Sequence, residues 1–512
     1  MIVSFNRMPT TIRAPLFYAE VNAGLNYYAG NSRHLVIGNK LSGGSASPNV
    51  PIIVQANNIE SLFGAGSMIV DMIRTARRNN PIGEIWALPL ADAVGSAAAV
   101  GKFALSGSPT PGQLTVYVIG RRYKVTIPVT SADTATTLAA ALAAKINAGY
   151  IDSSGQTRLY PVSAAIGTGS PDPVTTVVLT ARNKGPLGNN ISLDNTLVGD
   201  EGANAALVTV TAMSGGSGAP DPTAGLAACG ATEFDMISCP YADSTTLDIL
   251  KSFLSDSGGR WDPMQDLYGH AFTANFGNLS AQTTLGAARN DPHVSIMGVQ
   301  ASPTPPWIWA AAIGALVQAH KNLGAALTEA GEISRPMQTL VLQDVEGPRT
   351  LAQQWALADR NSLYYSGIAG YTVARDGSVM IDRLVTTYQT NAYGVGDTTW
   401  LDVETLYQTA YALRYLKQIV TQTYPRSSLA PDNPGGLQNL VTPRDIKATL
   451  IHAYSNLVNA GVMKNLQLFA DNLVVEISSD PNRVNVYLPL DVVNQLRIFA
   501  VNATTFLDAA AN

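Results

Sequence analysis

The side chains that most often do chemistry are scattered along this chain. Its five histidines are His34, His270, His293, His320 and His452. No second histidine or cysteine stands near any of them at the spacing that a helix or hairpin uses to bind a metal ion. An isolated histidine is more often a structural residue than a ligand, so we interpret all five as structural.

Two other groups of reactive residues are also isolated. Asp344 and Glu346 form a close acidic pair in the segment LQDVEGP, but no group near them in the sequence could share acid–base work. We interpret this pair as loop-capping residues. Cys229 and Cys239 are the only cysteines, which excludes a disulfide framework and a cysteine-rich zinc site. Both are expected to fill space in the core.

The glycine-rich segments do not form a nucleotide-binding loop. GSAAAVGKF, residues 95–103, has five residues between its glycines where a phosphate-binding loop has four, and Phe103 stands where a magnesium-binding Ser or Thr belongs. LFGAGSM lacks the third glycine of a dinucleotide fingerprint, and no G-x-S-x-G motif is present. The sequence therefore predicts no cofactor and no metal, and an α/β enzyme with a β-rich insertion is the least favoured alternative.

Composition favours a chain that buries its surface against other copies, with a large globular protein with plain loops as the alternative. The 512 residues are 46% hydrophobic and only 13% charged, with 44 glycines and a net charge of −5. Without a basic run, direct binding to a nucleic-acid backbone is not expected. The most apolar run, residues 307–317, is too short to span a bilayer and predicts a buried helix, so no membrane insertion is expected.

Apolar strands that alternate with helices predict an α/β fold, α+β overall. We expect a mostly parallel sheet with helices on both faces. A stretch of short β-like runs separated by Gly/Pro/Ser loops interrupts that rhythm and predicts an inserted β-rich surface domain. The predicted parts are an N-terminal arm (1–20), an α/β core (21–96 and 221–370), the inserted domain (97–220), a C-terminal α+β domain (371–490) and a C-terminal arm (491–512).

The C-terminal domain opens with a hairpin and a long helix. Asp376-Gly377 between two apolar runs is a strong hairpin signal, because both residues tolerate positive φ. A helix is predicted over residues 400–422, with Thr399 as N-cap and Asp402 in a capping-box position. Its apolar stripe is expected to be Leu406, Ala410, Leu413 and Val420. Tyr407, Tyr411 and Tyr415 are expected at the core edge with solvated hydroxyls, or alternatively at a subunit contact.

Several segments of this chain, in their order along the sequence, resemble contractile-tail sheath proteins of Mu-like myophages. The N-terminal resemblance lies in VIGNK, LFGAGSMIVDMIRTARRNNP and IWALPL. IGRRYKVTI, DTATTLAAALAAKINA and LTARNKGPLGNNISL resemble the family's inserted domain. HVSIMG, SRPMQTLVL, GSVMIDRLVTTY and LRYLKQIVTQTYPRSSLA resemble its core and C-terminal domain. The resemblance covers nearly the whole chain.

The resemblance implies a self-assembling, non-enzymatic virion protein. Its partners would be other copies in stacked hexameric rings, the tail tube protein, the baseplate and the tail terminator. Assembly would take place in the host bacterial cytoplasm, and contraction would drive the tube through the host envelope for genome ejection. The inserted domain would face outward and the C-terminal domain would face the tube. The sheath of a related contractile injector, a bacteriocin or toxin-delivery particle, remains an alternative.

The two ends of the chain supply candidates for contacts between subunits. Both ends are apolar and strand-like, and an unpaired strand invites strand addition. The inter-subunit strand candidates are Ile2, Val3, Phe5, Leu496, Ile498, Phe499 and Val501; the acceptor hairpin candidates are Val475, Ile477, Val484 and Val486. Pairing within a single subunit is the alternative. The family's architecture further suggests that the helix at residues 443–461 contacts the tube through Arg444 and Lys447.

Overall fold

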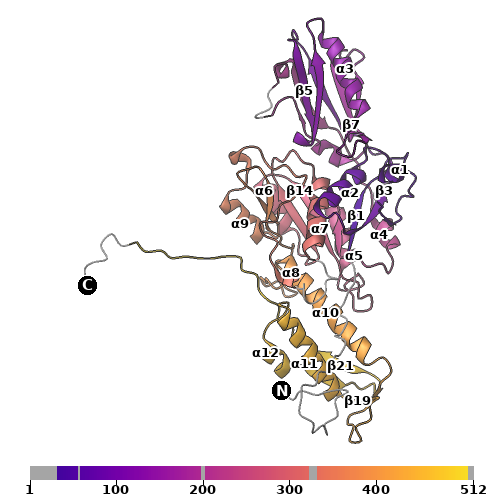
Figure 1. Cartoon of the computed structure of the whole chain (residues 1–512), viewed down its shortest axis with the longest axis vertical. Helices are drawn as coiled ribbons and strands as arrows, with labels where there is room; N and C mark the ends of the chain where they lie inside the picture. The colour runs from indigo at the N-terminus through magenta and orange to yellow at the C-terminus, as the bar shows by residue number, and fades with distance from the viewer. Residues whose placement is uncertain (1–31, 56–57, 198–201, 322–330, 506–512) are drawn as a thin grey trace, which may run out of the picture.

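The computed structural model describes residues 32–55, 58–197, 202–321 and 331–505. Three parts follow one another along the long axis in Figure 1: the strands around β5 at one end, the sheet that contains β1 and β14 in the middle, and helices α10 to α12 at the other end. The N-terminal arm candidates Ile2, Val3 and Phe5 lie outside the described residues.

The middle part is built on a six-stranded sheet. Its strands are β1 (Arg33–Asn39), β2 (Ile52–Ile53), β3 (Glu84–Leu90), β13 (Met236–Ser238), β14 (His270–Phe276) and β15 (Val294–Val299). They lie in the order β15-β14-β13-β1-β3-β2, and β2 alone runs antiparallel to its neighbour in this sheet. The mostly parallel sheet predicted from continuous apolar runs is therefore confirmed.

Helices lie against both faces of this sheet. They are α2 (Met68–Asn79), α4 (Thr223–Ala228), α5 (Ser244–Leu254) and α7 (Pro306–His320). A Cβ on Gly38 of β1 would stand 2.9 Å from the sulfur of Met72, so α2 lies directly on one face. A Cβ on Gly225 of α4 would stand 2.8 Å from Leu88. Leu88 pairs with Ile37, which points to the face opposite Gly38, so α4 covers that second face.

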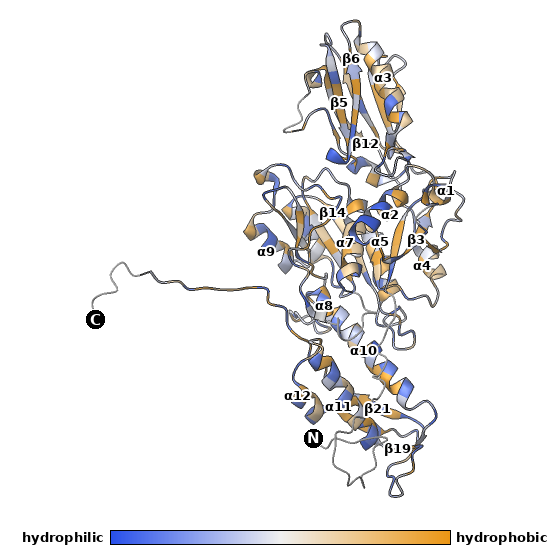
Figure 2. Cartoon of the chain, viewed as in Figure 1, coloured by the Kyte–Doolittle hydropathy of each residue, from blue (hydrophilic) through white to orange (hydrophobic). Residues whose placement is uncertain are grey.

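Helix α7 is apolar on every side because it lies inside the protein. Its residues from Pro306 to Gln318 are all buried, and it contacts α2 and three strands of the sheet. Figure 2 shows hydrophobic residues (orange) on α7 and on the strands beside it. This agrees with the buried helix predicted from residues 307–317. Among the described residues, no helix is long and apolar enough to cross a membrane.

A second part lies between β3 and α4 in the sequence. One sheet has the order β12-β4-β10-β9 and another the order β11-β5-β6, with α3 (Ala135–Ala148) packed on them. Their strands are β4 (Val100–Leu105), β5 (Gly112–Val118), β6 (Tyr123–Val129), β9 (Val162–Ile166), β10 (Thr176–Ala181), β11 (Leu193–Asp194) and β12 (Val208–Ser214). The chain enters and leaves this part side by side, since Ala97 and Ser217 exchange backbone hydrogen bonds of 3.0 and 3.1 Å.

The third part begins after a hairpin of β16 (Gly370–Val373) and β17 (Val379–Arg383), whose turn contains Gly377 at φ 86°. This confirms the hairpin predicted from Asp376-Gly377. Helices α10 (Val403–Thr423), α11 (Pro443–Asn459) and α12 (Leu466–Asn472) follow. The rings of Tyr454 and Phe469 stack at 3.8 Å and join α11 to α12.

Short elements complete the described chain. They are α1 (Ile59–Phe63), α6 (Leu279–Ala287), α8 (Gly331–Ser334), α9 (Leu357–Tyr365), β7 (Tyr150–Ile151), β8 (Thr157–Arg158), β18 (Ser428–Leu429), β19 (Leu440–Val441), β20 (Val474–Ile477) and β21 (Val484–Tyr487). Four one-turn 3-10 helices also occur: Gly120–Arg122, Pro186–Asn190, Ala205–Leu207 and Leu351–Gln353.

Three expectations about α10 are wrong. Of the predicted apolar stripe, Leu406 and Ala410 are buried, but Leu413 is only half-buried and Val420 is 36% exposed. Tyr407, Tyr411 and Tyr415 are not at a wet core edge: they are 3%, 0% and 0% exposed, because α10 packs against both the middle part and α11. The Tyr407 hydroxyl donates to the Asp235 carbonyl at 3.2 Å. The N-cap is Asp402 rather than Thr399, and its side chain makes no capping hydrogen bond. The Asp402 carboxylate instead holds Arg383 through two contacts of 2.8 and 2.9 Å.

Candidate functional site

The histidines take structural positions where the structure describes their contacts. His34 Nε2 lies 2.7 Å from Ser238 Oγ, and the Ser238 hydroxyl donates to the Ala310 carbonyl at 2.7 Å. Because that hydroxyl is already donating, the His34 Nε2–H donates to it. Burial, aided by the charge of Arg77, lowers the pKa of His34 to about 3. His34 thus links β1, β13 and α7 as a neutral residue.

The other histidines show no catalytic arrangement in the described residues. His270 Nε2 lies 2.8 Å from Ser295 Oγ, and burial, then the nearby His293, lowers its pKa well below the usual value. His293 stacks on Trp261 and lies 3.0 Å from Asp256. His320 is half-buried and His452 is exposed. The described residues contain no group of three His, Cys, Asp or Glu side chains that could hold a metal ion.

Because His34 is neutral in the folded chain, we expect the unfolding free energy of the chain to fall in acid. Its folded-state pKa is far below the unfolded value of about 6.5, so from pH 6.5 down towards 3 the unfolded chain binds more protons. Unfolding free energy should fall by about 1.4 kcal/mol per pH unit for this residue. Urea denaturation at pH 7, 6 and 5 should show a steeper loss for the parent chain than for His34→Gln. The exposed His452→Gln serves as control, and equal slopes for parent and His34→Gln would contradict the assignment.

The cysteines fill core positions. Cys229 and Cys239 are 3% and 0% exposed. Burial raises the pKa of the Cys229 thiol to about 11 and that of Cys239 to about 12. Thiols with such pKa values remain protonated at neutral pH and react slowly.

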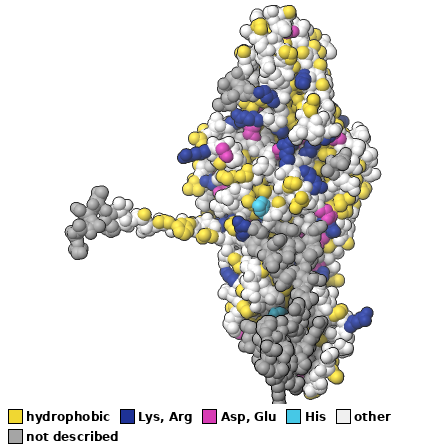
Figure 3. Space-filling view, viewed as in Figure 1, with side chains coloured by type: hydrophobic (Ala, Val, Ile, Leu, Met, Phe, Trp, Pro, Cys, Tyr) yellow, Lys and Arg dark blue, Asp and Glu magenta, His cyan; other side chains and the backbone are white. Residues whose placement is uncertain are grey.

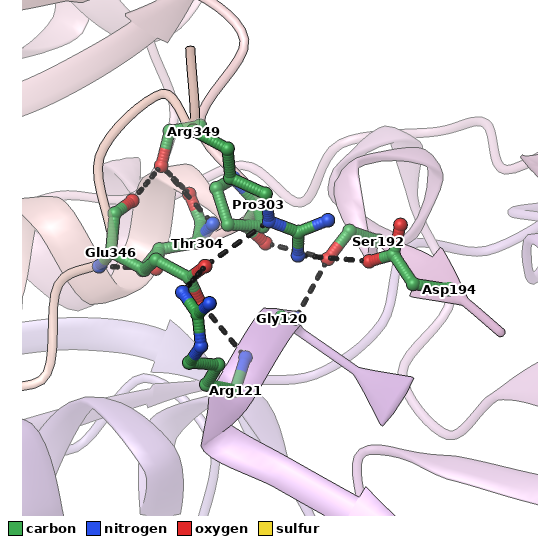
Figure 4. Close-up of polar contacts among 9 residues, drawn as sticks. Gly120, Arg121, Ser192, Asp194, Pro303, Thr304, Glu346 and Arg349 are labelled. Carbon is green, nitrogen blue, oxygen red and sulfur yellow. Dashed lines mark hydrogen bonds and ion pairs between the residues drawn. The ribbon is translucent and has the colours of Figure 1, made fainter. Parts of the chain in front are cut away.

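The acidic pair has partners that the sequence did not reveal. Glu346 accepts from the Arg121 backbone N–H at 2.8 Å, from the Arg121 side chain at 3.2 Å and from Arg349 Nε at 3.1 Å. Arg349 also reaches Asp194 at 3.0 Å. Figure 4 shows Glu346 between these two arginines. Arg121 and Asp194 belong to the part inserted after β3, so Glu346 joins that part to the middle one.

Two further links strengthen this junction. Gly120 N–H donates to Ser192 Oγ at 3.0 Å, and the Ser192 hydroxyl donates to the Pro303 carbonyl at 2.8 Å (Figure 4). Asp344 pairs with Arg78 and lies 3.0 Å from Arg122, a side chain only 10% exposed. The expectation that the pair Asp344 and Glu346 merely caps a loop is therefore corrected: both residues connect two parts of the chain.

A cavity of about 480 Å³ opens at this junction and is lined by four arginines, Arg74, Arg78, Arg121 and Arg122. Each of them is paired with a carboxylate: Glu60, Asp344, Glu346 and Asp344 respectively. Arg122 also lies 3.7 Å from Asp71, so the four arginines face four carboxylates and their positive charge is compensated within the chain. The arrangement indicates a structural connection rather than an anion-binding site.

The C-terminal arm leaves the body as an extended segment. Figure 1 shows it projecting sideways, and Figure 3 shows hydrophobic atoms (yellow) along it. Leu496, Ile498, Phe499 and Val501 are 73%, 80%, 83% and 70% exposed. No residue from 494 to 505 belongs to a strand. Four large apolar side chains in succession are therefore left in water, which is typical of a surface that another molecule covers.

The four acceptor candidates lie together on one face of a two-stranded sheet. In the pair β20–β21, Val475 stands opposite Val486 and Ile477 opposite Val484. Residues directly opposite in an antiparallel pair point to the same face, so these four side chains form one row. Val475 packs against the core, and β20 contacts α11 on this side. Within the described residues, neither β20 nor β21 has a further strand neighbour.

The second face of this hairpin is more open and is mixed, because it carries the polar pair Glu476 and Asn485 beside one apolar pair. Val474 stands opposite Tyr487, and they are 49% and 62% exposed. The hairpin thus presents free backbone edges with an apolar row on one face and one exposed apolar pair on the other. Such an edge is a template for an added strand. The structure does not bring the arm of the same chain to this edge: no strand pairing joins residues 494–505 to β20 or β21.

The tube-contact candidates lie on the first turns of α11. Thr442 caps this helix by a reciprocal pair of hydrogen bonds with Asp445, and Pro443 occupies the first turn. Arg444 is exposed and Lys447 is half-buried. Both residues stand near the N-terminal end of the helix, and Lys447 is two turns before Tyr454, on the side of α11 that stacks on Phe469 of α12.

Sequence reasoning missed the residues that hold the root of the arm. Arg497 reaches Glu404 at 2.8 Å and Asp402 at 3.3 Å, and its side chain is only 12% exposed. The available signal was one arginine inside the apolar run QLRIFAV. A charged side chain in such a run indicates either a solvent-facing position or a specific partner, and only the fold distinguishes the two.

Comparisons with known proteins define the class. Two family models match the chain: the phage tail sheath protein central domain over residues 215–387 and the phage tail sheath C-terminal domain over residues 396–506. The tail sheath protein of the Mu-like prophage FluMu of Haemophilus influenzae is 32% identical over 509 residues, which is 98% of this chain and 99% of the relative.

Solved structures of sheath tail proteins are similar as well. The one from Desulfitobacterium hafniense is 13% identical with a TM-score of 0.48, over 94% of this chain and 97% of that one. The one from Listeria innocua is 12% identical with a TM-score of 0.48, over 91% and 93%. The class is that of contractile tail sheath proteins, which are structural and not enzymatic. This chain belongs to the tail sheath protein family of Mu-like prophages.

Proposed function

We propose that this chain forms a contractile sheath of stacked hexameric rings around a tail tube. Contraction of the sheath drives the tube through the host envelope and so permits genome ejection. The observation that carries this proposal is the combination of an exposed apolar arm and a hairpin with free strand edges in one chain. Two copies satisfy both features at once when the arm of one pairs with the hairpin of the other.

The arm carries the side chains that this pairing needs. Successive residues of a strand point to opposite faces, so Ile498 points to one face, and Phe499 and Val501 point to the other. An added strand would therefore extend the apolar row of the hairpin on one face and lie beside Val474 and Tyr487 on the other. Each hydrogen bond contributes about 1 kcal/mol and each fully buried side chain about 1.5–3 kcal/mol, against the entropy of ordering the arm. A strand of about six residues provides about four such hydrogen bonds.

Contraction in this proposal needs no catalysis. The middle part is a rigid sheet between helices, and the inserted part is joined to it by the ion pairs of Glu346 and Asp344. Two packings of these rigid bodies, separated by a kinetic barrier, provide the stored free energy. The arms keep neighbouring copies connected while the bodies change their contacts.

The remaining partners are those that membership of the sheath family implies. Other copies, the tail tube protein, the baseplate and the tail terminator would contact this chain in a virion assembled in the host cytoplasm. The inserted part would face outward, and α11 would face the tube with Arg444 and Lys447 as polar contacts. Co-sedimentation of Arg444→Glu/Lys447→Glu with assembled tail tubes tests this orientation, since unchanged binding would contradict it.

Electron microscopy of the purified chain at high concentration tests the proposal. Hollow tubes or stacked six-fold rings are the expected result, because each copy carries both a donor arm and an acceptor hairpin. The same measurement in the presence of tail tube and baseplate proteins removes any barrier to nucleation. A chain that remains monomeric under both conditions would contradict the proposed function.

A further inference from the structure

The root of the C-terminal arm runs along the start of α10 and is held there by alternate residues. Val493, Gln495 and Arg497 are partly buried, whereas Asn494, Leu496 and Ile498 are exposed. This alternation is the period of an extended chain that lies with one face on a surface.

Three polar side chains of α10 make the contacts. Buried Gln408 donates to the Val493 carbonyl at 2.9 Å, and Gln495 donates to Gln408 Oε1 at 3.0 Å. Arg497 lies 2.8 Å from Glu404 and 3.3 Å from Asp402. Glu404 and Gln408 are one helical turn apart, about 6 Å along the axis, and two extended residues span about 6.6 Å. The spacing of the helix thus matches the spacing of the arm, which runs antiparallel to α10.

The charges at the end of this contact are balanced only with Arg497 in place. The Glu404 side chain is 0% exposed, and its second oxygen accepts from the Met337 backbone N–H at 3.0 Å. Asp402 already pairs with Arg383. Together Arg383, Arg497, Asp402 and Glu404 form a neutral group. Removal of Arg497 would leave a buried carboxylate without its cation, which is strongly unfavourable.

Beyond Arg497 the described part of the arm, residues 498–505, makes no comparable ion pair or hydrogen bond with the body. Ile498, Phe499 and Val501 are at least 70% exposed. Residues 498–512 span at most about 50 Å when extended, whereas residues 491–512 span about 75 Å. The position of the last fixed residue therefore sets how far the arm of one copy reaches.

We propose that Arg497 is a latch: it fixes the arm to Glu404 of α10 and to Asp402, the N-cap residue of that helix. The part of the arm that can change direction then begins at Ile498. Arg497 is a positioning residue, which acts on neighbouring copies through the direction and reach of the arm. This inference rests on the proposed sheath function for its meaning, although the latch itself belongs to the single chain. A fixed pivot keeps the connection between copies at one length while their bodies move.

Spin labels on the unassembled full-length chain test the latch. Ala500→Cys places one label on the arm and Thr421→Cys places the other on exposed α10, while buried Cys229 and Cys239 remain unlabelled. The expected result for the parent chain is a narrow distance distribution by pulsed electron resonance. Arg497→Leu should broaden the distribution, and Arg497→Lys should restore part of its sharpness. A broad distribution in the parent, or a narrow one in Arg497→Leu, would overturn the proposal.

A second variant distinguishes loss of the Arg497 contact from a general folding defect. Glu404→Gln removes the charge that holds Arg497 but keeps an oxygen for Met337 N–H, so it should broaden the same distribution. The double variant Arg497→Leu/Glu404→Gln should show no additional broadening, because both changes break one link. Exposed Arg426→Leu is the matched control and should leave the distribution unchanged. Failure of the parent chain to form tubes would contradict the proposed function without affecting this result.

Discussion

Removal of residues 498–512 is expected to abolish tube and ring formation while the chain stays folded. The described residues of this segment make no strand pairing and expose Ile498, Phe499 and Val501, so the folded body loses little when they are absent. A neighbouring copy would lose a whole added strand. The measurements are electron microscopy and sedimentation for assembly, and thermal unfolding for the monomer. Loss of assembly at an unchanged melting temperature is the predicted pair of results.

Point substitutions make the same prediction quantitative. Phe499→Ala should cost about 2 kcal/mol per arm and raise the critical concentration for assembly about 30-fold. Ile82→Asn is the matched control, because Ile82 is 95% exposed but lies in the loop between α2 and β3. Assembly that is equally sensitive to both substitutions would contradict a specific role for the arm and would indicate general hydrophobic association instead.

Arg414→Leu is expected to destabilise the chain by about 3–5 kcal/mol. Arg414 on α10 pairs with Glu233 and lies 2.7 Å from Asp235, and the Arg414 and Asp235 side chains are each only 6% exposed. Asp235 immediately precedes β13, so this ion pair ties α10 to the parallel sheet. Without the arginine, the buried Asp235 carboxylate has lost its cation. Urea denaturation monitored by circular dichroism measures the change.

The contribution of the Arg414–Asp235 ion pair to stability can be distinguished from the effect of lost packing. Asp235→Asn in the Arg414→Leu background should recover part of the lost stability, since it removes the uncompensated charge. Arg426→Leu, at an exposed position, should change the unfolding free energy by less than about 0.5 kcal/mol. A loss below about 1 kcal/mol for Arg414→Leu would show that this junction is not held by the buried charge pair.

Local patterns predicted the parallel sheet and the hairpin. Continuous apolar runs such as HLVIGN and HVSIMGVQ became β1 and β15, and the Asp376-Gly377 turn formed as expected. These features depend on residues close together in the sequence. The strand order, with β1 between β3 and β13, depends on contacts between distant segments, and the apolar pattern alone does not determine it.

The incorrect predictions have the same physical origin, because they too depend on contacts between segments that are distant in the sequence. Glu346 was interpreted without a partner because Arg121 lies 225 residues away in the sequence. The tyrosines of α10 were expected at a wet edge because one apolar stripe was taken to define the buried face. The helix packs against two parts of the chain, so its buried face is wider than one stripe. Asp402 has the residue type of a cap but binds arginines of β17 and of the arm instead.

The arm and hairpin candidates were identified from apolar alternation, and the structure places those of the C-terminal arm and the hairpin in exposed or edge positions. The latch could not be identified in this way. Its parts, Glu404 and Arg497, lie on different elements, and their pairing follows from the path of the arm along α10.

A cryo-electron microscopy reconstruction of the assembled tubes tests the central claim most directly. The account predicts that arm residues after Arg497 form an added strand at the β20–β21 hairpin of a neighbouring copy, with Phe499 and Val501 on one face of the enlarged sheet. It also predicts that Arg497 remains on α10 of its own chain. An arm folded back onto its own hairpin, or tubes whose copies contact one another only through their bodies, would contradict the account.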